Sequence, residues 1–140
     1  MSLLNDLKQQ WVGVVSLFIA VTALAASQYR SDVTEHNRTI RFAAFEMLRE
    51  LGALQQLVHQ THFGEQPPTD YNLQGWNHVL LIRDFSVLMP PPVPQHTEQL
   101  FAQWQQHWPT LATDRDSNDA ISHQITATRN AVTQLVKALE

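Results

Sequence analysis

The chain has 140 residues, no cysteine and a formal net charge of −4 with its seven histidines counted as neutral. This length fits one domain plus an anchoring segment, and the missing cysteines exclude disulfides, a cysteine-based zinc site and a thiol nucleophile. The slightly acidic balance gives no basic face for nucleic acid, so we expect no nucleic-acid partner.

An uncharged run, residues 11–27 (WVGVVSLFIAVTALAAS), lies near the N-terminus. A helix from Trp11 to Tyr29 covers roughly 27 Å, close to the hydrocarbon thickness of a bilayer, and amphipathic aromatic residues stand at both of its ends. We therefore expect residues 1–10 to form a short N-terminal tail, residues 11–28 a single transmembrane helix, and residues 29–140 a helical domain. The lipid bilayer is the first predicted partner, and the cell membrane is the predicted location.

Two properties of this segment have competing interpretations. Residues 23–25 (ALA) resemble a cleavage site, so a removable signal peptide is the alternative to a permanent anchor. Lysine and arginine near the run favour a C-terminal domain in the cytoplasm, and a periplasmic or extracellular domain is the alternative. The residues counted are Lys8 before the run and Arg30, Arg38 and Arg41 after it.

Small residues recur inside the uncharged run at spacings of 3, 4, 3 and 4, which puts them on one face of a helix. Such a face lets the backbone of a second membrane helix approach closely. We therefore predict a helix–helix contact in the membrane, with another membrane protein or by self-association. Its residues are Gly13, Ser16, Ala20, Ala23 and Ser27.

Beyond Tyr29 the apolar residues follow a heptad pattern, which is typical of a helix packed lengthwise on other helices. The predicted seam consists of Val33, Asn37, Ile40, Ala44, Met47, Leu51, Leu54 and Val58. Asn37 is its one polar member, and a polar residue on such a seam can fix register or oligomeric state. Extended backwards, the same spacing reaches Arg30, Ala26, Ala23, Ile19 and Ser16. Off the seam, Phe42, Phe45 and Leu48 predict that this helix buries more than one side.

Three further helices are expected after a loop that contains Gly64 and Pro67-Pro68. The four helices of the domain are predicted at about 29–60, 74–89, 95–108 and 118–138. The second is apolar nearly all round and reads as the most buried, and residues 90–94 (PPPVP) predict an extended, stiff connector after it. Ser117 to Asp119 supply capping groups for the last helix. The fold class is therefore all-α: a transmembrane helix that continues into an antiparallel four-helix bundle.

No motif for catalysis is present. His59 and His62 have a spacing that could share a metal, but a third ligand is not evident, and both residues sit at a helix end where cations are favoured. Glu46 and Glu50 are more typical of a solvated face beside Arg49 than of an acid–base pair. The tryptophans Trp76, Trp104 and Trp108 are better explained as core residues than as a ligand pocket. We predict no catalytic residue, no metal, no cofactor and no small-molecule substrate.

The sequence thus favours a non-enzymatic interaction protein held in the membrane by one helix. It would act as an accessory or regulatory subunit, or as a homo-oligomeric scaffold, of a bacterial-type membrane complex. The alternatives are an extracytoplasmic bundle that senses a ligand and, with less support, a metal-dependent enzyme that uses His59 and His62.

Overall fold

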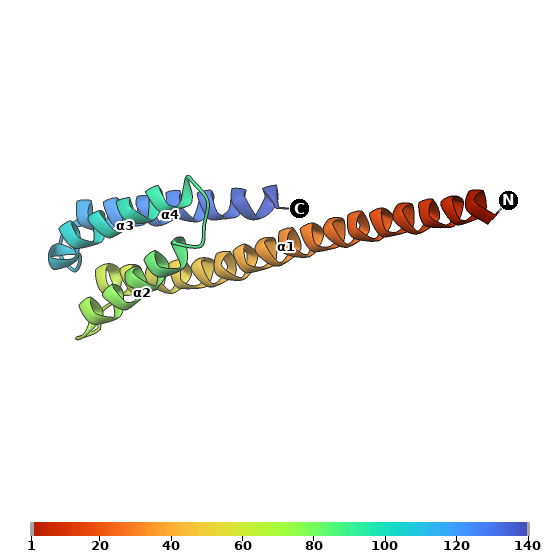
Figure 1. Cartoon of the computed structure of the whole chain (residues 1–140). Coiled ribbons are helices and arrows are strands. Elements are labelled where there is room, and N and C mark those ends of the chain that lie inside the picture. The colour runs from red at the N-terminus through yellow and green to blue at the C-terminus, as the bar shows by residue number, and fades with distance from the viewer. Residues whose placement is uncertain (1, 140) are drawn as a thin grey trace. The chain divides into compact units, whose positions relative to one another are not determined.

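The computed structural model of the chain describes residues 2–139. Within this range the chain is helical and contains no strand, which confirms the predicted all-α class. The elements are α1 (Ser2–Phe63), α2 (Tyr71–Ser86), α3 (Val93–His107), the short 3-10 helix η1 (Trp108–Thr110) and α4 (Arg115–Ala138) (Figure 1).

The chain divides into two compact units, and the division falls inside α1. Unit 1 consists of residues up to 38, and unit 2 begins at residue 39 and contains the rest of α1 with all the other helices. Unit 1 holds the uncharged run. Unit 2 holds the hydrophobic core.

Helix α1 is longer than the predicted elements at both ends. It already includes the residues expected as a short tail, and it continues to Phe63 instead of ending near residue 60. The backbone N–H of Gly64 donates to the carbonyl oxygen of Gln60 at 3.0 Å. A Cβ atom on Gly64 would lie 2.3 Å from that oxygen, so the close turn that ends α1 requires glycine.

Helix α2 begins about three residues earlier than predicted and ends at Ser86 instead of Met89. At its start the backbone N–H of Gln74 donates to the carbonyl oxygen of Asp70, and the Gln74 amide donates to the Asp70 carboxylate at 2.8 Å. After Ser86 the next three backbone N–H groups each bond three residues back, to Asp84, Phe85 and Ser86. Such bonds tighten the chain into a turn, because the proline that follows disfavours continued α-helix.

The prediction that α2 is the most buried helix is wrong. Its buried residues are confined to one stripe, Gly75, Val79, Ile82 and Ser86. Its opposite side carries large exposed apolar side chains. These residues, which we call the α2 leucine face, are Leu73 (64% exposed), Leu80 (42%) and Leu81 (42%), with Val87 and Leu88 just beyond the helix.

Residues 90–94 form a turn and a helix start, whereas the sequence predicted an extended connector. The backbone N–H of Val93 donates to the carbonyl oxygen of Pro90 at 3.3 Å, and α3 begins at Val93 with Pro94 in its first turn. Proline is tolerated there because the first N–H groups of a helix have no partner within the helix.

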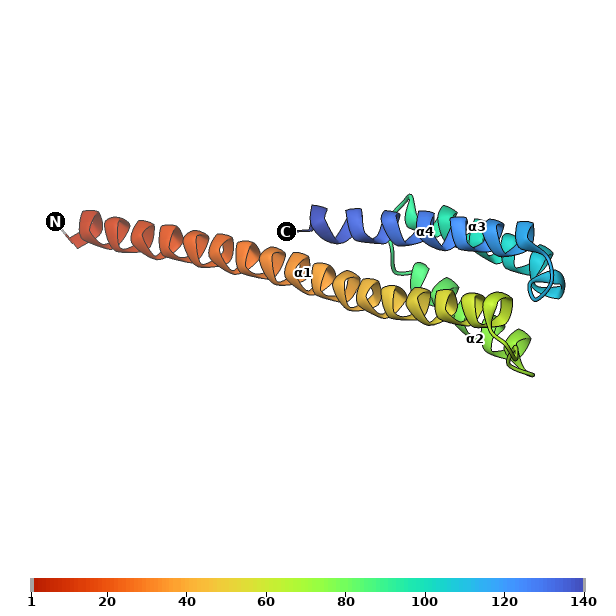
Figure 2. The same cartoon turned by 180° about the vertical axis from the view of Figure 1, so that it is seen from behind.

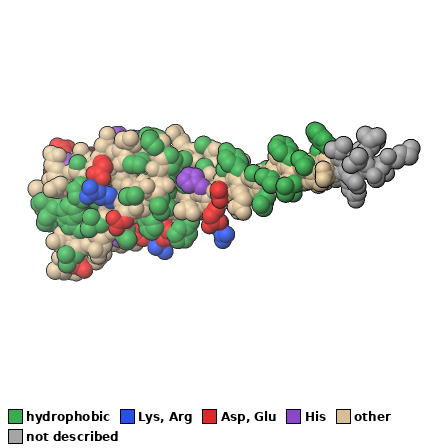
Figure 3. All heavy atoms as spheres, viewed as in Figure 1, with side chains coloured by type: hydrophobic (Ala, Val, Ile, Leu, Met, Phe, Trp, Pro, Cys, Tyr) green, Lys and Arg blue, Asp and Glu red, His purple; other side chains and the backbone are tan. Residues whose placement is uncertain are grey.

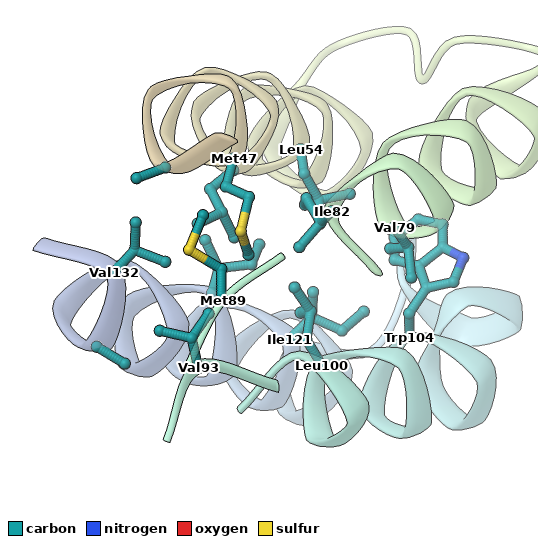
Figure 4. Packing of buried hydrophobic residues seen from close by; sticks show 14 of the residues in the cluster. Met47, Leu54, Val79, Ile82, Met89, Val93, Leu100, Trp104, Ile121 and Val132 are labelled. Carbon is teal, nitrogen blue, oxygen red and sulfur yellow. The ribbon is translucent and has the colours of Figure 1, made fainter. Parts of the chain in front are cut away.

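The core of unit 2 draws side chains from all four α-helices. Figure 4 shows Met47 and Leu54 of α1 facing Val79 and Ile82 of α2, Leu100 and Trp104 of α3, and Ile121 and Val132 of α4. Trp104 is fully buried, as expected for a core tryptophan, while Trp76 and Trp108 are half-buried against the core. Helices α3 and α4 lie side by side in both views (Figures 1 and 2).

Two details of α1 and α4 differ from the prediction. Phe42 and Phe45 are 62% and 60% exposed, so the expected burial of a second side of α1 is wrong for these two rings. The N-cap of α4 is Asp114 and not a residue of the segment 117–119, because its carboxylate accepts the backbone N–H of Ser117 at 3.0 Å. This bond satisfies one of the first N–H groups of α4, which have no partner within the helix.

Candidate functional site

The uncharged run of unit 1 presents its side chains outward. By length and composition α1 is the one helix in the described part of the chain that could cross a membrane, and no residue of its most apolar window is buried. Trp11, Phe18 and Tyr29 are each 70–73% exposed. In Figure 3 hydrophobic side chains cover this segment on the face in view, without acidic or basic ones.

The predicted small-residue face lies on this exposed surface. Gly13, Ser16, Ala20, Ala23 and Ser27 are all exposed. A Cβ atom on Gly13 would meet nothing within 4 Å, so no contact inside the described chain requires glycine at this position. The missing side chain leaves this position open to close approach from outside the described chain.

A shallow apolar hollow lies on the surface of α1, beside the predicted face and not on it. It is lined by Phe18, Ile19, Thr22, Ala23 and Ala26, so Ala23 is the one residue that the two share. The Thr22 hydroxyl donates to the carbonyl oxygen of Phe18 at 2.8 Å, which leaves the methyl group to line the hollow. The sequence signal for this site was the backward extension of the seam, which names Ile19, Ala23 and Ala26.

The predicted seam is divided between the two units. Its members in unit 2 are all buried in the core: Ile40, Ala44, Met47, Leu51, Leu54 and Val58. Its two members in unit 1 are not, since Val33 is 43% exposed and Asn37 is half-buried.

Unit 2 contains a buried carboxylate that sequence reasoning treated as solvated. Glu50 is only 7% exposed, and its Oε2 lies 2.7 Å from Nδ1 of His78 on α2. Arg49 connects Glu46 (2.7 Å) with the other oxygen of Glu50 (3.3 Å), as the sequence suggested. A carboxylate taken out of water needs such partners, so this group fixes α1 against α2.

The two histidines with metal-like spacing are not part of a metal cluster. Nδ1 of His62 lies 2.8 Å from the carbonyl oxygen of Leu111, and the ring of His59 packs edge-on against Phe63. Within the described residues no group of three or more histidine and acidic side chains could hold an ion. These contacts fix the end of α1.

A serine, a histidine and an aspartate meet at the start of α4, but they do not have the geometry of a nucleophilic site. The Ser117 hydroxyl donates to the Asp114 carboxylate at 2.6 Å, and His107 lies 3.2 Å from the same hydroxyl. A nucleophile must give its proton to a base and reach substrate, whereas Ser117 is 1% exposed. The bond from Ser117 lowers the pKa of Asp114, which marks a helix cap.

The described surface carries exposed apolar residues in both units. Its candidate sites are the exposed run and hollow of unit 1, and the α2 leucine face with Phe42 and Phe45 in unit 2. Comparison of the chain with protein-family models, curated proteins and solved structures gives no match.

Proposed function

We propose that this chain is a single-pass membrane protein whose helical domain binds other proteins. It would serve as an accessory or regulatory subunit, or as a homo-oligomeric scaffold, of a bacterial-type membrane complex. The observation that carries the proposal is the uncharged run of α1, about as long as a bilayer is thick, with no residue of its apolar window buried.

The proposed domain is an antiparallel four-helix bundle. Three contacts support opposite directions for the later part of α1 and for α4. Arg41 donates to the carbonyl oxygen of Leu139, Gln55 contacts Ser122 at 3.0 Å, and His62 contacts Leu111 just before α4. As the residue number rises along α1, that of its partner falls.

The interaction role is supported by apolar residues on unit 2 that the core does not use. The α2 leucine face carries five large side chains at 42–81% exposure. Large contiguous apolar patches are uncommon on soluble monomers, and exposed apolar residues that gather on one element are therefore candidates for a contact site. The contacts of Arg83 with Glu98 (2.9 Å) and with the Phe101 ring (4.6 Å) hold one edge of α2 against α3. A partner would therefore meet a fixed surface.

Extraction of native membranes with alkaline carbonate tests the anchor. We expect the full chain to stay in the membrane pellet and to be released by detergent. Replacing Leu17 and Val21 with arginine should shift it towards the soluble fraction, because each central arginine costs about 3 kcal/mol of insertion. The matched control carries the same arginine replacements at Leu73 and Leu80, two exposed leucines of unit 2. This variant should stay in the pellet. Release of the wild-type chain by carbonate would contradict the proposal.

Three further measurements test whether the first helix is retained, which way the chain crosses the membrane, and whether it binds other proteins. An intact mass that includes the first 25 residues separates an anchor from a cleaved signal peptide. Because the chain has no cysteine, Thr113→Cys gives a single thiol, and labelling it from one side of the membrane fixes the orientation; we expect labelling from the cytoplasm. Detergent-solubilised protein that is monomeric and copurifies with nothing would contradict the interaction role.

A further inference from the structure

We draw no further inference here: the strongest candidate, the α2 leucine face on unit 2 (Leu73, Leu80, Leu81, Val87 and Leu88), belongs to the surface already described, and nothing in the structure shows what covers it.

Discussion

Gly75 of α2 lies directly against the Trp104 ring, so a larger side chain at this position should destabilise unit 2. A Cβ atom at Gly75 would lie 1.9 Å from Cζ2 and 2.1 Å from Cη2 of the Trp104 ring. Ordinary contact begins at 3.4 Å, so the ring or α2 must move by about 1.5 Å. Trp104 is fully buried, and Trp76 packs edge-on against it at 6.5 Å, so the ring has little room to move.

Gly75→Ala should therefore destabilise unit 2, although alanine is the better helix former. Overpacking a core costs about 1–3 kcal/mol, and the helix propensity of alanine returns about 1 kcal/mol. With a displacement this large and a ring this enclosed, we expect the upper end, a net loss of about 2 kcal/mol. For a domain of this size that lowers the melting temperature by roughly 8–16 °C.

Unfolding of the full chain in detergent micelles, followed by far-UV circular dichroism, measures this loss. Gly52→Ala is the matched control, because the nearest atom to its new Cβ, Nη2 of Arg129, is at an ordinary 3.5 Å. It should be neutral or stabilise by about 0.5–1 kcal/mol. Trp104→Phe, which removes the clashing ring atoms, should cost less in the Gly75→Ala background than in wild type. Equal stability of Gly75→Ala and wild type would refute the packing argument.

Three further predictions concern unit 2. His78→Ala leaves the buried Glu50 carboxylate without its shortest hydrogen bond and should cost about 1–3 kcal/mol in urea unfolding; an unchanged midpoint would contradict this. The pKa of Asp114 is lowered chiefly by the Ser117 hydroxyl, so its stabilising effect is present above the unfolded pKa and is lost as the pH falls through the folded pKa. Asp114→Asn should flatten the acid side of the stability–pH curve, and an unchanged curve would count against it. Val87→Ser, at an 81% exposed position, should change stability by less than about 0.5 kcal/mol, whereas Val79→Ser should destabilise clearly.

The spacing of apolar residues predicted the core of unit 2 well where the pattern was unambiguous. The seam residues from Ile40 to Val58 are buried, because a 3-4 spacing leaves only one face to bury. Trp104 was likewise expected in the core. Periodicity carries this information directly, and no knowledge of the partner helices is needed.

The same reasoning failed for α2 because the apolar residues in its sequence are not confined to one face of the helix. Apolar residues stand on both sides of the helix, so nothing in the spacing separates Val79 and Ile82 of the core from Leu80 and Leu81. The helix ends were also inexact, since Gly64 and Asp114 act through single backbone contacts that periodicity does not report. The pair of Glu50 and His78 is separated by 28 residues, and only the packing of α1 on α2 brings it together.

The candidate site in unit 1 shows a further limit of spacing arguments. Small residues mark one face, centred on Ala20, but the hollow lies at Ile19, Thr22 and Ala26. The difference arises because a depression depends on the neighbours of a small residue as well as on the residue itself. The Thr22 hydroxyl also turns back to the carbonyl oxygen of Phe18, and the sequence does not show that bond.

Substitutions at the exposed apolar residues of unit 2 can distinguish an effect on folding from an effect on association with a partner. Phe42, Phe45, Leu73 and Val87 contribute little burial to the folded unit, since each is at least 60% exposed. Polar replacements there should leave the free energy of unfolding nearly unchanged. If these residues contact a partner, the same replacements should weaken that association, because contact residues are the ones desolvated on binding. A loss of stability equal to the loss of association would instead assign them to the fold.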